Sequence, residues 1–242
     1  MKNLLFTFLL SSISLFAQEK LVVEYENRTE VDLSKETDPQ MIKILKAAND
    51  FKSNYQLITT KEESSFKEIE RLDNSQKADG IQISFHNLNK NLYKNFKNNQ
   101  SLTFEDYNGK LFIIEDSLII QPWILQREKS TFLGYEVKRA TFENNGATYE
   151  AWYAPKLGYK NGPDKFTGLP GIILKLIITE NDAIPTEKTY YTATKVEIND
   201  KAKIEKPTKG ELISRKDYDI FSAEQYEKFK KMQSDKIDKK ID

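Results

Sequence analysis

The chain has no cysteine, and His86 is the only histidine among its 242 residues. Without cysteine it can form no disulfide bond, and it lacks both a thiolate nucleophile and a thiolate metal ligand. A zinc site normally needs several His or Cys ligands, and a Ser-His-Asp relay would depend on His86 alone. We interpret His86, beside a run of Asn and Lys, as a surface or turn residue. We therefore expect no cofactor and no metal.

An excess of charge of one sign is also lacking, because 37 Lys and Arg balance 37 Asp and Glu. Nothing in the overall charge favours binding to nucleic acid or to anionic lipid, so no nucleic-acid partner is expected. The sequence also lacks both glycine-rich phosphate-binding patterns and the acidic calcium loop. No catalytic motif is recognisable, which favours a protein that is not an enzyme.

The N-terminus has the order of a secretory signal peptide. Lys2 supplies the positive charge, residues 4–16 are mostly apolar, and Ala17 follows. The apolar run is shorter than the roughly 20 residues that span a bilayer, so no transmembrane segment is expected in the mature chain. We predict export, with cleavage near Ala17, to the periplasm, the outer-membrane surface or the medium. The absence of cysteine at the junction excludes a lipid anchor.

The rest of the chain is long enough for one domain, and its 12% aromatic and 31% charged residues are typical of a globular protein. We predict a signal peptide over 1–17, a single domain over 18–205, and a polar tail with a short helix over 206–242. The predicted class is α+β and strand-rich: a curved antiparallel sheet with one packed helix in the N-terminal half and a short C-terminal helix.

Hydrophobic patterns place the elements of the first half. Residues 21–26 are typical of a strand, and Asp38 and Pro39 are a suitable N-cap and first residue for a helix. Apolar side chains then recur at helical spacing as far as Phe51, so the helix should pack on the sheet. Further strands are predicted over residues 55–60, 64–69 and 81–85.

Two Asn-Gly pairs predict tight hairpins, at Asn108-Gly109 and Asn145-Gly146, because a type I′ turn needs positive φ at both positions. The strands expected around the second pair cover residues 132–142 and 147–154. That turn would place Phe142 opposite Tyr149 and Arg139 opposite Trp152, the latter as a possible cation–π pair. Residues 172–178 are almost continuously apolar, which indicates a central strand buried on both faces. Another strand is expected over residues 189–198.

The tail carries a capping box at Ser222 and Gln225, with Phe221 and Tyr226 spaced for a hydrophobic staple. We predict a short helix that starts there and frays after Met232.

Residues 158–171 hold four of the nine glycines and two of the seven prolines. Pro170-Gly171 suits a type II turn in which Gly171 has positive φ. Such a loop is either a connector or a binding surface. The candidate binding residues of the loop are Gly162, Pro163, Phe166, Gly168, Leu169, Pro170 and Gly171.

The motif GLPGIIL, preceded by GPDKF, EAWYAP and GYEVKRATF, resembles the GLPGLI family of exported bacterial proteins. The resemblance covers residues 123–174 and implies a location in the cell envelope. That family has no established activity, so no catalytic residue follows. Many relatives have Cys where Val137 stands here, and often Arg where Ala147 stands, so a role for that Cys cannot apply to this chain.

Three functions stay open. The first is a non-enzymatic envelope protein that binds an apolar ligand or a partner, with Trp123, Trp152, Tyr153 and Phe166 either lining a cleft or forming core. The second is an accessory or structural subunit of an outer-membrane assembly that contacts a membrane-protein partner through residues 162–171. The third is a hydrolase that uses two carboxylate pairs beside the first hairpin, Glu105-Asp106 and Glu115-Asp116.

Overall fold

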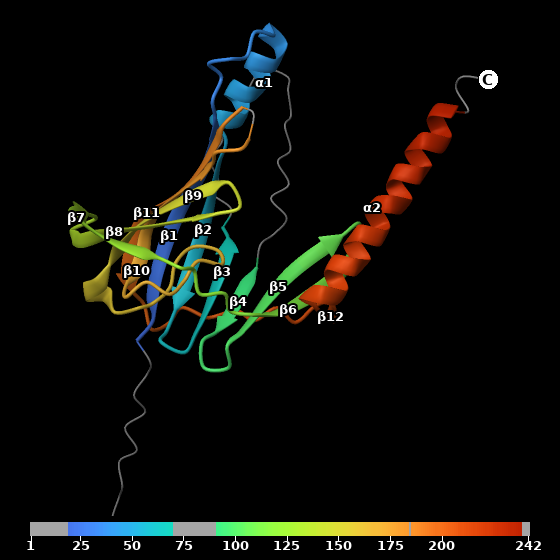
Figure 1. The fold of residues 1–242 in the computed structure, drawn as a ribbon. Helices are drawn as coiled ribbons and strands as arrows, with labels where there is room; N and C mark the ends of the chain where they lie inside the picture. Colours follow the sequence, from blue (N-terminus) through green and yellow to red (C-terminus); the bar gives the residue numbers. More distant parts are fainter. Residues whose placement is uncertain (1–18, 70–90, 184, 239–242) are drawn as a thin grey trace, which may run out of the picture.

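The computed structural model describes residues 19–69, 91–183 and 185–238, with side chains of the last helix described as far as residue 232. The predicted signal peptide, the expected strand over 81–85 and His86 lie outside the described residues. Figure 1 shows a strand-rich protein with two α-helices in its described part. The strands are β1 (Leu21–Val31), β2 (Lys52–Thr59), β3 (Glu63–Glu68), β4 (Leu92–Asn95), β5 (Gln100–Tyr107), β6 (Lys110–Ser117), β7 (Ile124–Phe132), β8 (Tyr135–Asn144), β9 (Ala147–Ala154), β10 (Ile172–Glu180), β11 (Glu187–Ile198) and β12 (Glu211–Ser214). A 3₁₀ turn, η1 (Pro155–Leu157), follows β9.

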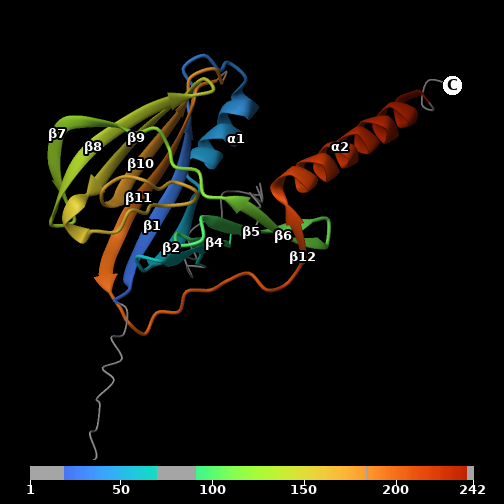
Figure 2. The ribbon, with the colours of Figure 1, turned by 60° about the horizontal axis from the view of Figure 1, so that its bottom comes forward.

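All twelve strands of the described part belong to one sheet, in the order β12-β6-β5-β4-β3-β2-β1-β11-β10-β9-β8-β7. Neighbouring strands are antiparallel except β12, which pairs parallel with β6. The sheet is therefore open and mixed, where the sequence predicted a curved antiparallel sheet, and β12 and β7 form its two edges (Figure 2). The strand-rich character is confirmed.

Helix α1 (Pro39–Asn49) begins as predicted, because the Asp38 side chain accepts hydrogen bonds from the backbone N–H groups of Gln40 and Met41. Its predicted packing on the sheet is not confirmed: none of its residues is buried, and Met41 is 42% exposed. The helix lies beyond the end of β1 (Figure 1), where the Asn49 side chain binds both backbone groups of Val31. The helix is amphipathic, but because no surface of the sheet faces it, its apolar side chains are not buried.

Both predicted hairpin turns are present, with φ of 51° and 87° at Asn108-Gly109 and 48° and 75° at Asn145-Gly146. The register of the second hairpin is confirmed, including the pairs Phe142–Tyr149 and Arg139–Trp152. The Phe142 and Tyr149 rings stack 4.2 Å apart.

The predicted cation–π pair does not form, because Arg139 finds a carboxylate instead. Its guanidinium lies 2.7 Å from the Glu150 carboxylate, and the Trp152 indole N–H donates to the same carboxylate at 2.9 Å. The register therefore brings Arg139 and Trp152 together through Glu150.

A third tight turn, Leu133-Gly134, divides the strand expected over residues 132–142. Leu133 has φ of 49° and Gly134 has φ of 80°, so this is a type I′ arrangement without the usual Asn. The chain before the turn forms edge strand β7, and the chain after it forms β8. The strand-like pattern of apolar and polar residues continues through Leu133 and Gly134, so the sequence did not predict this turn.

The tail is more ordered than predicted. Strand β12 joins the sheet, and helix α2 (Arg215–Asp238) begins seven residues before Ser222 with Ser214 as its cap, whose hydroxyl accepts from the Asp217 N–H at 3.1 Å. The predicted capping box at Ser222 is thus an internal turn of the helix. Phe221 packs on Phe112 with ring centroids 5.0 Å apart and is not available for the expected staple.

The main core lies under the centre of the sheet. Ile172, Ile173 and Leu174 of β10 are all fully buried, which confirms burial on both faces for the first half of the predicted range, whereas Ile177 and Ile178 are only partly buried. The strand is flanked by β9 and β11. Tyr55 and Phe66 stack 5.0 Å apart beside them. The loop over residues 158–171 contributes Tyr159, Phe166 and Leu169 to the same core.

Candidate functional site

The Gly/Pro loop, residues 158–171, crosses the sheet and is largely buried. Of the seven predicted binding residues in it, Gly168 and Pro170 are exposed, and the other five are buried: Gly162, Pro163, Phe166, Leu169 and Gly171. Most of the loop therefore contacts the protein itself.

Lys94 of β4 fastens this loop to the sheet. Its side chain is 1% exposed, and its ammonium group donates to Asn161 Oδ1 at 2.8 Å and to the Asp164 carbonyl at 2.6 Å. The carbonyls of Gly162 and Phe166 lie slightly farther away, at 3.4 and 3.5 Å. Burial lowers the pKa of Lys94 to about 7, while the Asp164 carboxylate opposes this shift. The main role of Lys94 in this arrangement is to satisfy the buried carbonyl groups of the loop.

Lys94 belongs to a row of polar side chains across five neighbouring strands. Successive register partners are Thr59, Ser64, Lys94, Ser101 and Asp116. Partners directly opposite each other in antiparallel strands point to the same face. The sheet thus carries a polar stripe on this face. Thr59, at one end of the stripe, accepts a hydrogen bond from Asn161 Nδ2 of the loop at 3.1 Å.

The connection between β6 and β7 fastens the loop from its other side. Gln121 Oε1 accepts from the Thr167 N–H at 2.9 Å, and Gln121 Nε2 donates to the Lys165 carbonyl at 3.3 Å. Trp123 Nε1 donates to the Thr167 carbonyl at 2.9 Å, and its ring packs edge-on against Phe142. Trp123 therefore clamps the loop.

The predicted positive φ of Gly171 is wrong, since positive φ in this turn occurs at Gly168, at 96°. Gly171 is required for a different reason. A Cβ atom at this position would lie 2.6 Å from the Ala154 carbonyl carbon and 2.8 Å from the Pro155 Cα. The backbone of the loop passes too close to the end of β9 for any side chain.

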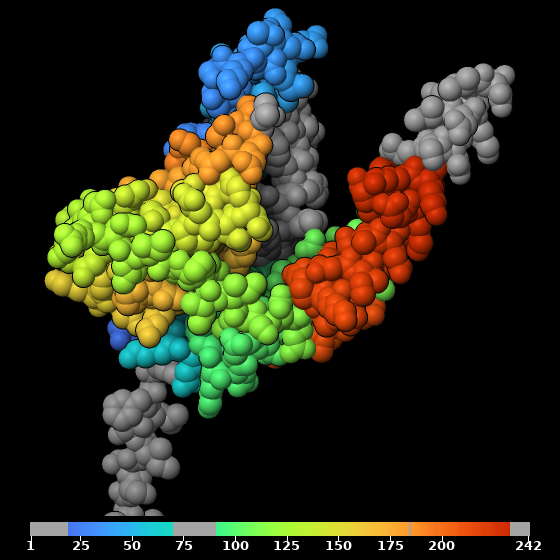
Figure 3. All heavy atoms as spheres, in the orientation of Figure 1, coloured from blue at the N-terminus to red at the C-terminus, as the bar shows by residue number. Residues whose placement is uncertain are grey.

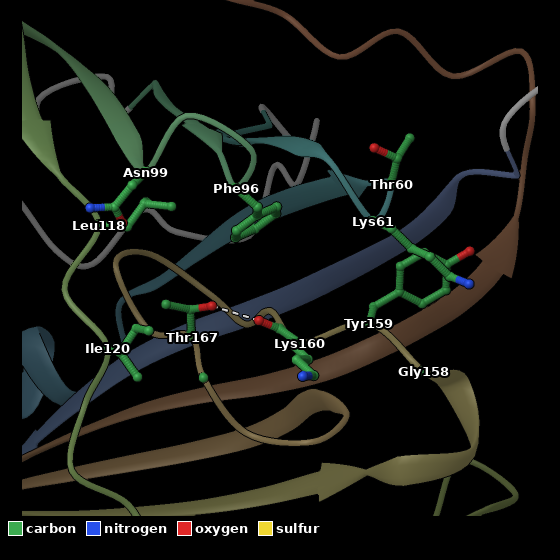
Figure 4. A pocket seen from close by; sticks show the side chains of 11 residues that line it. Thr60, Lys61, Phe96, Asn99, Leu118, Ile120, Gly158, Tyr159, Lys160 and Thr167 are labelled. Carbon is green, nitrogen blue, oxygen red and sulfur yellow. Dashed lines mark hydrogen bonds between the residues drawn. The ribbon is translucent and has the colours of Figure 1, made fainter.

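A cavity of about 370 Å³ opens between this loop, the β4–β5 turn and the β6–β7 connection (Figure 4). The side chains of Phe96, Leu118, Ile120 and Tyr159 provide apolar walls, and Thr60 and Asn99 provide polar groups. We call this cavity the loop pocket. Its remaining lining residues are Lys61, Gly158, Lys160, Thr167 and Gly168.

Two lysines border the loop pocket. Lys61 and Lys160 are both exposed, and neither forms an ion pair within the part of the chain that the structure describes. In Figure 4, Lys160 lies below the cavity beside Thr167, whose hydroxyl donates to the Lys160 carbonyl at 2.5 Å. This bond fixes the backbone that carries the lysine. The pocket thus combines apolar walls with two positive charges that no carboxylate of the described residues neutralises.

The aromatic residues predicted from sequence do not line the loop pocket. Trp123 clamps the loop, Phe166 and Tyr153 are buried, and Trp152 binds Glu150. The pocket uses Phe96 and Tyr159 instead. Sequence reasoning missed Phe96 because it follows a polar stretch, and Tyr159 because it was grouped with the glycines around it.

The two carboxylate pairs are not brought into a catalytic arrangement. Glu105 lies opposite Phe112, and Glu115 lies opposite Leu102 and accepts a hydrogen bond from Gln100. Glu105 and Asp116 border a second, more polar cavity of about 490 Å³. They stand four register positions apart on adjacent strands, which is about 13 Å at strand spacing. Carboxylates in glycoside hydrolases are only about 5 to 10 Å apart.

The described residues form neither a metal site nor a membrane-spanning helix. No group of three or more His, Asp or Glu side chains there is placed to hold a metal ion. No helix in the same ranges is long and apolar enough to cross a membrane.

These features define an open mixed β-sheet protein with a small pocket under a fastened loop, and comparisons with known proteins agree on the fold. Residues 127–175 match a family model described as a protein of unknown function, Porph_ging. Two solved structures of PNGF-II, in space groups P21 and C2, are similar, each with a TM-score of 0.55. They share 20% and 19% sequence identity over 84% and 83% of this chain. No curated protein matches the chain.

The chain spans about a third of the length of these solved structures, 33% and 32% respectively. At this level of identity the likeness concerns the fold alone. The family match includes β8, β9 and the whole Gly/Pro loop, and the loop forms one wall of the loop pocket.

Proposed function

We propose that this protein is a non-enzymatic binding protein whose loop pocket takes a small amphiphilic acid, such as a single-chain carboxylate. The observation that supports this proposal is the combination of apolar walls at Phe96, Leu118 and Tyr159 with Lys61 and Lys160 at the border, which form no ion pair with the described residues. An apolar chain would be removed from water against the walls, and its acidic head would face the two ammonium groups.

The dimensions of the pocket favour a small ligand. Ligand pockets measure about 300 to 1,000 Å³, and the volume of about 370 Å³ lies near the lower limit. The pocket is lined by four separate segments, and hydrogen bonds from Lys94, Gln121 and Trp123 hold the Gly/Pro loop among them. A pocket formed before the ligand arrives loses little conformational entropy on binding.

We further propose that the protein acts in the cell envelope after export. The order of Lys2, the apolar residues 4–16 and Ala17 supports removal of a signal peptide, and the resemblance to GLPGLI proteins supports the same location. Intact mass measurement of the protein recovered from its own cells tests this proposal. We expect the mass of a chain that begins near residue 18. A mature chain that retains Met1 would contradict export.

Calorimetric titration with dodecanoate tests the binding proposal. We expect saturable one-to-one binding, and weaker binding of dodecyltrimethylammonium, which has the same chain and the opposite charge. Leu118→Trp should abolish binding because the larger ring fills the cavity. The double substitution Lys61→Gln and Lys160→Gln should reduce dodecanoate affinity and leave the affinity for the cationic probe unchanged or higher.

A matched control is available in α1, where Lys43 and Lys46 are exposed and which supplies no lining residue to the pocket. The corresponding double Gln substitution there should leave both titrations unchanged. Equal binding of the two probes by the wild type, or undiminished binding by Leu118→Trp with an unaltered circular dichroism spectrum, would overturn the proposal.

A further inference from the structure

The segment between β6 and β7, with the first residue of β7, presents isoleucines to solvent, whereas Gln121 and Trp123 between them point inward. Ile119, Ile120 and Ile124 are 63%, 71% and 63% exposed, whereas Gln121 is 8% exposed and Trp123 is partly buried. Gln121 and Trp123 both bind the backbone of the Gly/Pro loop. The isoleucines are therefore held outward by a fastened backbone. This segment crosses the front of the molecule in Figure 3.

Lysines lie close to two of these isoleucines, Ile119 and Ile120. Ile120 lines the loop pocket together with Lys61 and Lys160, and Ile119 lines the neighbouring cavity together with Lys165. Lys160 and Lys165 both come from the loop to which Gln121 and Trp123 are fastened. Lys61, Lys160 and Lys165 are exposed, and the described residues offer them no ion pair. We call these isoleucines and lysines the Ile/Lys rim.

We propose that the Ile/Lys rim docks the protein on the surface of an anionic phospholipid bilayer, so that the loop pocket opens toward the lipid. This inference rests on the proposed function, since the docked bilayer would supply or receive the amphiphilic acid. Exposed aliphatic side chains enter the boundary between headgroups and acyl chains, and nearby lysines are attracted to anionic headgroups. The balanced net charge of the whole chain does not prevent this, because charge attraction falls off within about 10 Å.

The composition of the rim favours a bilayer over a protein partner. The centres of protein interfaces are enriched in aromatic residues and Arg and depleted in Lys. The rim has the opposite composition, with exposed isoleucine and lysine side chains, and the neighbouring aromatic residue Trp123 is packed against Phe142. Long lysine side chains can also cover apolar surface while their ammonium groups reach the headgroups.

The position of Ile120 links docking to the pocket. The side chain of Ile120 is 71% exposed and also lines the loop pocket. A Cβ atom added at Gly168 would lie only 2.7 Å from Ile120 Cγ2. Gly168 thus leaves room for Ile120 at the entrance. A bilayer that receives Ile119 and Ile124 would lie against this entrance, and a single-chain lipid could pass without crossing water.

Sedimentation with vesicles tests the inference. We expect the protein to bind vesicles that contain phosphatidylglycerol and to bind pure phosphatidylcholine vesicles much more weakly. Ile119→Ser and Ile124→Ser, neither of which lines the loop pocket, should each weaken binding by about tenfold. Lys165→Gln should weaken it by about fivefold. Met41→Ser and Lys43→Gln, at exposed positions of α1, serve as matched controls and should leave vesicle binding unchanged.

The pocket-filling variant Leu118→Trp separates this inference from the proposed function, because it should lose dodecanoate but retain vesicle binding. If Ile119→Ser, Ile124→Ser and Lys165→Gln all leave vesicle binding unchanged, the proposed docking role of the rim is wrong, even if dodecanoate still binds. Absence of vesicle binding by the wild type would overturn it as well. Vesicle binding that depends on the rim, in a protein that does not bind dodecanoate, would support docking and refute the proposed ligand.

Discussion

The ammonium group of Lys94 lies 2.8 Å from the side-chain oxygen of Asn161, which joins strand β4 to the Gly/Pro loop through a fully buried contact. Asn161 completes the junction by donating to Thr59 and accepting from the Gly162 N–H at 2.9 Å. Residues that are far apart in the sequence thus share one polar junction. The walls of the loop pocket depend on it, because Tyr159 and Lys160 directly precede Asn161.

Replacing Lys94 with Met should destabilise the protein by about 3 kcal/mol, since the buried carbonyls of Asp164 and its neighbours would lose their donor. Urea denaturation measures this change. The control Lys67→Met removes a lysine whose ion pair with Glu205 is at the surface, and it should cost less than about 1 kcal/mol. Equal effects of the two substitutions would show that the junction does not hold the loop.

Stability should rise with pH above neutrality because of Lys94. Burial lowers its pKa in the folded state to about 7, below its ordinary value, so the unfolded chain binds more protons between about pH 7 and 10. The free energy of unfolding should therefore increase across that window, by at most about 1.4 kcal/mol per pH unit. Urea midpoints measured from pH 6 to 10 should show the rise in the wild type and a flatter profile in Lys94→Met.

The trend should reverse in more alkaline solution. Burial raises the pKa of Tyr25 and Tyr191 above the ordinary value of 10, so these side chains stay neutral in the folded protein while they ionise in the unfolded chain. Stability is then lost above about pH 10. Parallel pH profiles of the wild type and Lys94→Met would contradict the assignment of the neutral-to-alkaline rise to Lys94.

Gly171→Ala should lower the stability of the protein more than Gly109→Ala, because the added Cβ has no room at Gly171. A Cβ at Gly171 would collide with the backbone of Ala154 and Pro155, and neither can move without disturbing β9. A Cβ at Gly109 meets nothing within 4 Å, so that substitution costs only the positive φ of 87°, about 1 to 2 kcal/mol. Thermal denaturation should rank the two variants in this order. The reverse order would refute the close approach at Gly171.

Leu133→Asn should stabilise the β7–β8 hairpin. Leu133 is 43% exposed and has φ of 49°, a conformation that costs a leucine about 1 to 2 kcal/mol and that Asn tolerates well. We expect an increase in the melting temperature of a few degrees. A decrease would mean that the leucine side chain contributes more by packing than its backbone conformation costs.

The parts of the fold that could be predicted from sequence are those with local chemical causes. Asn145-Gly146 fixed both a turn and the register of its strands, because few residues adopt positive φ. Asp38 and Pro39 likewise marked the start of α1 through local hydrogen bonding. Leu133-Gly134 escaped prediction because leucine carries no turn signal.

The candidate site depends on contacts between distant segments, so the sequence could not show it. Lys94 meets Asn161 across 67 residues, and Gln121 meets Thr167 across 46. A lysine in the polar stretch around residue 94 looks like a solvated side chain until strand register places it under a loop. Likewise, Phe96 becomes a pocket wall only through its position beside Tyr159 and Leu118.

Native mass spectrometry of the protein isolated from the cells that make it, with extraction and identification of any bound small molecule, tests the central claim most directly. Our account predicts one anionic single-chain amphiphile per protein molecule in the wild type and none in Leu118→Trp. A wild-type protein that is bare, and that stays bare after incubation with dodecanoate, would contradict the claim that the loop pocket binds such a ligand.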